Sequence, residues 1–196
     1  MELTGESIVM AGRARSAWAE SDFERVFSEH YARIVSVLYR VVGDRARAEE
    51  LASDTFLRLY RQPLGENEYR NLGGWLYRTA VRMGIDSLRS AVRRARYEDA
   101  AGQDLAVGPD TPLDELLLAE RRRLVRAALA RLKPKQAQIL ILRSSGLSYK
   151  EIAEVLGTKT NCVGRLLARA EAAFEKVWRR TAAVQPRRGW RNHVHF

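Results

Sequence analysis

The sequence contains very little cysteine and histidine. Cys162 is the only cysteine among 196 residues, so one chain can form neither an intramolecular disulfide nor a cysteine-based zinc cluster. His30 lies in a predicted helix, whereas His193 and His195 lie in the carboxy-terminal tail. Because no constellation of nucleophile, base or metal ligands appears, we predict no catalytic residues, no metal, no cofactor and no enzymatic activity. The cysteine usage favours a reducing cytoplasm.

Long apolar runs are also missing. No window approaches the roughly 20 apolar residues that a membrane-spanning helix needs. The opening residues, "MELTGESIVMAGRARSAWAE", lack the basic start and the continuous apolar core of a secretory signal. We therefore expect a soluble intracellular protein without membrane insertion.

No segment shows the sustained alternation of a β-strand, and apolar residues recur instead at helical spacings of three and four. Residues 99–111, "DAAGQDLAVGPDT", lose this periodicity and collect Gly, Pro and Asp, which predicts a flexible linker. The predicted fold is all-α, with two small helical domains joined by that linker and a helix-turn-helix in the second. The predicted bounds are an N-terminal extension at 1–20, domains at 21–98 and 112–180, and a C-terminal tail at 181–196.

The helix-turn-helix is predicted from "LSYKEIAEVLGTKTNCVGRLLARAEAAF", residues 147–174. Ser148 and Glu151 form a capping-box pattern, and Gly157 permits a sharp turn between two amphipathic helices. Such a turn lets the second helix enter a major groove while the first crosses the DNA backbone. The alternative is an ordinary helical hairpin with a solvated face. The candidate DNA contacts on the second helix are Thr160, Asn161, Gly164, Arg165, Ala168 and Arg169.

Charge and aromatic residues indicate a second binding region. The formal net charge of +10 suggests a polyanionic partner. Residues 72–98 combine aromatic side chains with many arginines, a mixture that can grip phosphates and stack an unpaired base. The alternative to nucleic-acid binding is that Trp75 belongs to the core and the arginines form a solvated face. In the preceding helix, Glu49, Glu50 and Asp54 share a surface near Leu51, which suggests a protein partner instead.

These motifs, in this order and separated by a linker, resemble the bacterial extracytoplasmic-function (ECF) sigma factors. "AEELASDTFLRLYR" is similar to the helix of that family that binds the polymerase clamp. "GGWLYRTAVRMGIDSLR" is similar to its minus-ten segment, and "LSYKEIAEVLG" to the first half of its minus-thirty-five helix-turn-helix. The resemblance implies a sigma domain two at 21–98 and a sigma domain four at 112–180.

The resemblance also implies partners and site residues. The implied partners are core RNA polymerase, double-stranded promoter DNA and the melted minus-ten strand, and an anti-sigma factor is a candidate partner because family members are often sequestered by one. The residues implied for core polymerase are Glu49, Glu50, Leu51, Asp54 and Phe56. The residues implied for minus-ten DNA are Asn67, Tyr69, Arg70, Asn71, Trp75, Tyr77, Arg78, Arg82 and Arg89.

The sequence departs from the family pattern in three segments. Met83 stands where Asn is usual in the minus-ten segment, and Ser53 replaces a common Gln beside the clamp surface. In the recognition helix, Gly164, Arg165 and Leu166 replace the usual Lys-Ser-Arg. An alternative function is therefore a sigma-like interaction module with reduced or lost promoter recognition. Another is a helix-turn-helix repressor, which would leave the acidic helix and the aromatic loop unexplained.

Overall fold

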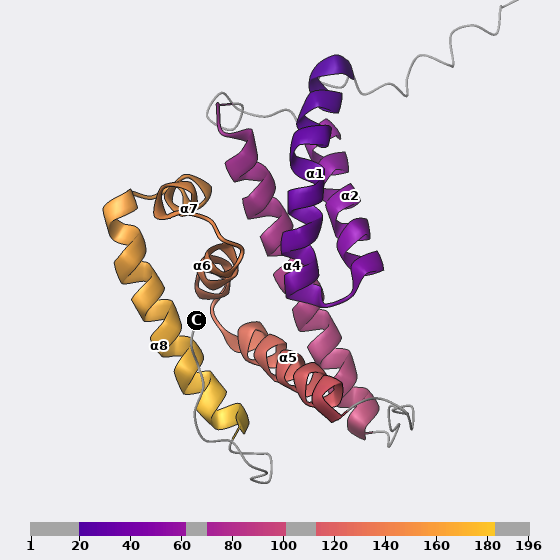
Figure 1. Ribbon diagram of the computed structural model, residues 1–196, viewed down its shortest axis with the longest axis vertical. Coiled ribbons are helices and arrows are strands. Elements are labelled where there is room, and N and C mark those ends of the chain that lie inside the picture. The colour runs from indigo at the N-terminus through magenta and orange to yellow at the C-terminus, as the bar shows by residue number, and fades with distance from the viewer. Residues whose placement is uncertain (1–19, 62–69, 101–112, 183–196) are drawn as a thin grey trace, which may run out of the picture.

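The computed structural model describes residues 20–61, 70–100 and 113–182, and every regular element in these ranges is an α-helix. The helices run in the order α1 Glu20–Val42, α2 Arg45–Arg61, α4 Leu72–Ala100, α5 Leu113–Arg131, α6 Pro134–Ser144, α7 Tyr149–Leu156 and α8 Thr160–Ala182 (Figure 1). This confirms the predicted all-α fold. No helix among the described residues is both long enough and apolar enough to span a bilayer.

Helices α1, α2 and α4 pack together and are called the N-terminal unit below (Figure 1). Gly43, with a φ of 78°, turns the chain between α1 and α2, a conformation that costs glycine little because it lacks a Cβ. The Asp44 carboxylate accepts a hydrogen bond from the Arg47 backbone N–H at 2.6 Å and so caps the start of α2. Apolar faces of the three helices form the core of this unit, with Ile34, Leu38, Phe56, Leu59 and Leu76 among its fully buried side chains.

Helices α5 to α8 form the C-terminal unit, and α7 with α8 makes the predicted helix-turn-helix. The Ser148 hydroxyl accepts from the Glu151 backbone N–H at 3.3 Å, and the Glu151 carboxylate accepts from the Ser148 backbone N–H at 2.7 Å. The Ser148 hydroxyl also donates to the Glu151 carboxylate at 2.6 Å, and this bond together with the one from the Ser148 backbone N–H lowers the pKa of Glu151, because both favour its charged form. Gly157 ends α7 with a φ of 63°, which turns the chain toward α8.

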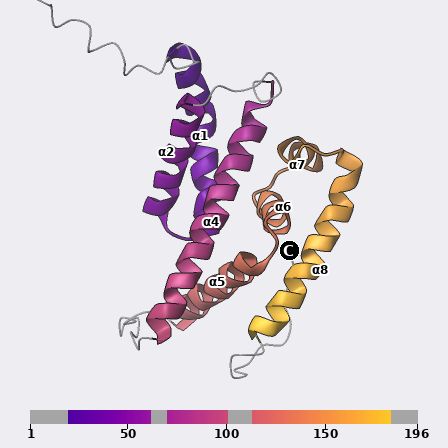
Figure 2. The same cartoon turned by 180° about the vertical axis from the view of Figure 1, so that it is seen from behind.

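The two units are packed against each other. Helix α4 contacts α5, α6 and α7, and α1 contacts α6; Figures 1 and 2 show α6 and α7 between α4 and α8. One buried cluster runs through both units, because Val81 and Ile85 of α4 share it with Leu142 of α6 and Ile152 of α7. Most of the predicted linker lies outside the described residues, and the domain boundaries stay predictions.

Candidate nucleic-acid and polymerase interface

A groove of about 830 Å³ lies between α2 and α4 of the N-terminal unit. Its α4 wall is a stripe of residues four apart, so that they share one face of the helix. The stripe consists of Arg78, Arg82, Asp86, Ser90 and Arg94. The opposite wall includes Arg47, Leu51, Asp54 and Arg58 of α2.

The groove carries an excess of positive charge. Five arginines line it, against the carboxylates of Asp54 and Asp86. Arg78 and Arg82 are exposed to solvent. A groove with this charge balance is suited to a phosphate backbone, because arginine pairs strongly with phosphate oxygens. Among the described residues, no three His, Cys, Asp or Glu side chains gather as metal ligands would.

Two hydrophobic side chains from the predicted sites line the groove and also belong to the core. Trp75 is 7% exposed and Leu51 is 3% exposed. Trp75 thus packs under the arginine stripe and leaves little ring surface open to stack a base. Met83, at the position where the family usually has Asn, is half-buried, and its sulfur accepts a hydrogen bond from the Thr55 hydroxyl at 3.6 Å. This position therefore offers no amide to a DNA base.

Two of the three acidic residues of α2, Glu49 and Glu50, are held by neighbouring arginines. Arg45 pairs with Glu49 at 2.9 Å, and Arg47 pairs with Glu50 at 2.6 Å. All four side chains are substantially exposed, so both pairs can reorganise around a partner at little cost.

Phe56 lies beneath the surface of α2 rather than on it. It is 2% exposed and meets the Phe27 ring at 4.9 Å between centroids. Phe56 can therefore support the predicted polymerase surface by packing but offers it almost no exposed area. The neighbouring Leu57 and Tyr60 are each 42% exposed. They are apolar surface positions on α2 that sequence reasoning did not include.

Three residues predicted for minus-ten DNA face the C-terminal unit instead of the groove. The Asn71 side-chain oxygen accepts from the Gly74 backbone N–H at 2.8 Å, and its amide nitrogen donates to the Glu154 carbonyl at 3.1 Å. Burial raises the pKa of Tyr77, Arg33 opposes the rise and Glu151 adds to it. The Arg89 guanidinium donates to carbonyls of the C-terminal unit.

Three further residues were predicted for minus-ten DNA: Asn67, Tyr69 and Arg70. Arg70 is exposed, whereas Asn67 and Tyr69 lie outside the described residues. Arg47, Arg58 and Arg94 also line the groove but were not among the residues predicted for minus-ten DNA. The four-residue spacing from Arg78 through Arg82 to Arg94 is the signal that would have found Arg94, and it would have separated Arg94 from Arg89.

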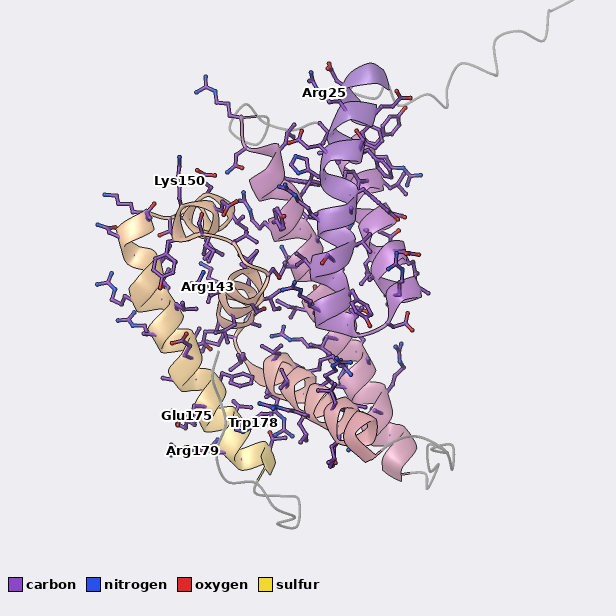
Figure 3. The ribbon with its side chains drawn as sticks, viewed as in Figure 1. Arg25, Arg143, Lys150, Glu175, Trp178 and Arg179 are labelled. Carbon is purple, nitrogen blue, oxygen red and sulfur yellow. The ribbon has the colours of Figure 1, made fainter. Side chains whose placement is uncertain are left out.

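The predicted DNA face of α8 is largely open. Asn161, Arg165, Ala168 and Arg169 are exposed, as is Thr160 in the first turn. Gly164 is half-buried, because the Tyr149 ring of α7 lies beside it: a Cβ built at Gly164 would be 3.7 Å from Tyr149 Cε2. The Arg143 guanidinium lies over the same ring, 5.6 Å from its centroid, at the end of α6 (Figure 3). This face therefore carries the positive charges of Arg165 and Arg169, but it is flat at Gly164, which has no side chain.

Replacing Gly164 by Lys is expected to strengthen binding of duplex DNA. The added Cβ makes only an ordinary contact with Tyr149, and the helix gains up to about 1 kcal/mol of propensity. One more cation near phosphate should steepen the dependence of log Kd on log salt by about 0.9. Fluorescence anisotropy with a labelled duplex across a salt series measures this slope. The matched variant Gly164→Gln adds a side chain without charge and should leave the slope unchanged, and an unchanged slope with Lys would mean that this face does not approach the duplex.

Comparisons with known protein families match both units. The model described as sigma-70 region 2 matches residues 26–94, and the model described as sigma-70, region 4 matches residues 122–174. The first match contains α2 and most of α4, which form the groove, and the second contains the helix-turn-helix.

Individual relatives agree with these models. The chain is 32% identical over 163 residues to the probable ECF RNA polymerase sigma factor SigI of Mycobacterium tuberculosis, a match covering 80% of this chain and 55% of the relative. It is also 32% identical to the ECF RNA polymerase sigma factor BldN of Streptomyces coelicolor, over 81% of this chain and 60% of BldN. The RNA polymerase sigma factor YlaC of Bacillus subtilis is 29% identical, over 78% of this chain and 90% of YlaC.

The chain thus spans little more than half of the length of SigI and BldN. The matches nevertheless cover both sigma-70 regions in the order that the sequence motifs predict. The chain belongs to the ECF sigma factors of the sigma-70 family, with region 2 in its N-terminal unit and region 4 in its C-terminal unit.

Proposed function

We propose that this chain directs promoter-specific initiation of transcription by binding core RNA polymerase and promoter DNA, without catalysis of its own. The observation that carries the proposal is the arginine stripe of α4, which faces α2 across the groove within sigma-70 region 2. Its charge suits a phosphate backbone, and the basic helix-turn-helix supplies a second DNA contact. Two linked contacts bind more tightly than either alone, because the second becomes intramolecular.

In this proposal α4 and α2 bind different partners. Arg78, Arg82 and Arg94 bind phosphates of the melted minus-ten strand, while Glu49, Glu50 and Asp54 of α2 meet core polymerase. On α8, Arg165 and Arg169 contact phosphates of the double-stranded upstream box, and Asn161 meets phosphate or base. The site of action is the bacterial cytoplasm, where polymerase works. An anti-sigma factor remains a candidate partner on the strength of the resemblance.

A second function has specific support. The flat face at Gly164 and the half-buried thioether of Met83 remove two side chains with which the family pattern would contact DNA. A sigma-like module that engages polymerase without reading promoters would tolerate both losses. The arginine stripe argues against that alternative, because a protein-only role gives it no phosphate to bind.

Run-off transcription separates the two functions. Purified core polymerase is combined with the full chain on a pool of genomic promoter fragments, and transcripts are sequenced. Defined start sites that need the chain support the sigma factor. Co-elution with core polymerase and no transcript above the core-only reaction would support the interaction module and overturn the proposal.

A further inference from the structure

Aromatic rings gather where the start of α1 lies beside the end of α2 (Figures 1 and 2). The Phe23 ring meets the Tyr60 ring edge-on at 5.2 Å between centroids, and the Phe27 ring stacks on Tyr31 at 4.6 Å. Phe56 of the core lies beneath them and contacts Phe23, Phe27 and Tyr31. The four rings above Phe56 are called the aromatic patch below.

The aromatic patch is open to water on its outer side. Phe27 is 38% exposed and Tyr60 is 42% exposed, while Phe23 and Tyr31 are half-buried. Aromatic rings stabilise a structure mainly through the area that they bury, so a contiguous group of half-open rings favours a further apolar partner. None of the four rings lines the groove between α2 and α4. The patch is therefore separate from the proposed DNA site.

The chain itself brings apolar side chains to this place. Residues 1–19 lie outside the described residues and join α1 at Glu20, three residues before Phe23. Their apolar side chains include the consecutive residues Ile8, Val9 and Met10, and also Trp18. Because these residues are tethered beside the patch, their effective concentration there is high without any second molecule.

The position of Trp18 in the sequence matches a known helix-start arrangement. Helix α1 begins at Glu20, so Ala19 holds the N-cap position and Trp18 directly precedes it. A hydrophobic residue at that position commonly packs against the fourth residue of the helix, forming a hydrophobic staple. The fourth residue of α1 is Phe23. The spacing therefore favours contact between Trp18 and the ring at the edge of the patch.

The run at residues 8–10 is within reach of the other rings. Met10 lies eight residues before Trp18, and eight extended residues span up to about 26 Å. Phe23 and Tyr31 are also eight residues apart, but a helix rises only about 12 Å over that distance. The segment is therefore long enough to cover Phe27 and Tyr60 after an anchor at Trp18.

We propose that residues 8–18 dock on the aromatic patch of their own chain, with Trp18 against Phe23 and the run 8–10 over Phe27 and Tyr60. This occupant is favoured over a second copy because tethering avoids most of the entropy loss of association. The segment is then a stabilising part of the N-terminal unit rather than a spacer before it. The proposal does not depend on DNA binding.

Disulfide formation within one chain tests the docking. Cys162 is the only cysteine, so Cys162→Ser gives a full-length cysteine-free chain. Met10→Cys is then combined with Arg61→Cys, next to Tyr60. The matched control combines Met10→Cys with Arg45→Cys, because Arg45 is also exposed but lies at the other end of α2, about 24 Å away along the helix. Non-reducing gel electrophoresis follows both pairs under a mild oxidant.

We expect the pair at residues 10 and 61 to form its disulfide about tenfold faster than the pair at residues 10 and 45, because docking raises the effective concentration at one end of α2 only. Adding Trp18→Ala should reduce the faster rate to that of the control pair. Trp190→Ala, in the carboxy-terminal tail, is the matched tryptophan control and should leave the rate unchanged. Trp18→Ala should also lower the urea midpoint, whereas Trp190→Ala should not.

Several results would overturn the docking. Equal rates in the two cysteine pairs would mean that the segment does not prefer the patch, and a fast rate that survives Trp18→Ala would remove its anchor. Disulfides between chains would assign the patch to a second copy. Slow disulfide formation, together with loss of co-elution with core polymerase in Tyr60→Ala, would assign it to polymerase. Failure of the proposed function looks different, because the absence of transcripts leaves the disulfide rates unaffected.

Discussion

Replacing Arg78 and Arg82 together by alanine is expected to reduce promoter-dependent run-off transcripts by about a hundredfold. Both side chains are exposed on the α4 wall of the groove, so each can pair with a phosphate of the melted strand. Loss of one charged hydrogen bond costs about 1.5–3 kcal/mol, and two such losses reach this magnitude. Full transcript levels would show that the groove is not the path of the strand.

The salt dependence of DNA binding tests directly whether Arg78 and Arg82 contact phosphates. Each lost phosphate contact on a single strand should make the slope of log K against log salt shallower by about 0.7, hence by about 1.4 for the double variant. The matched control is Arg25→Ala with Arg179→Ala, which also removes two positive charges. Those arginines form exposed ion pairs with Asp22 and Glu175, far along the chain from the groove. The control should keep both the transcripts and the slope.

Phe56→Ala is expected to destabilise the protein by about 3–5 kcal/mol, the usual cost of emptying an aromatic position in a core. Phe56 is 2% exposed and makes ring contacts with Phe23, Phe27 and Tyr31. Urea denaturation followed by circular dichroism measures the loss. The neighbouring Leu57→Ala, at a position 42% exposed, should cost less than about 1 kcal/mol.

A second substitution at the same position, Phe56→Leu, distinguishes a packing role of the ring from direct contact with polymerase. If Phe56 acts only by supporting the α2 surface, Phe56→Leu should recover much of the stability and should bind core polymerase like the unsubstituted chain. A stable Phe56→Ala protein that nevertheless loses polymerase would contradict this account, because it would require the ring itself to reach the partner.

The helices and the family could be predicted from local sequence. The helix-turn-helix predicted within residues 147–174 is present in the structure as Tyr149–Leu156 and Thr160–Ala182, and Pro134–Ser144 precedes it. Caps and turns explain this agreement: a proline at a helix start, the Ser148 and Glu151 box, and Gly157 act within a few residues of each other. Family motifs are equally local, so their order along the chain sufficed to identify regions 2 and 4.

The binding surface was less predictable. Arg89 and Arg94 are five residues apart on the same basic helix, and nothing local distinguishes them. Yet Arg94 lines the groove, whereas Arg89 caps the end of α5. Trp75 was equally ambiguous and is buried. The helical period separates these residues into faces, but it does not say which segment covers each face.

The sequence by itself determined that the chain is all-α, that it is basic, and where most of its helices begin and end. Tertiary structure decided which arginines face the groove, that Phe56 lies inside, and that region 4 packs on the side of α4 that bears Asn71, Tyr77 and Arg89. The physical reason is range: capping and periodicity act within one or two helical turns, whereas each of these outcomes depends on contacts between segments dozens of residues apart.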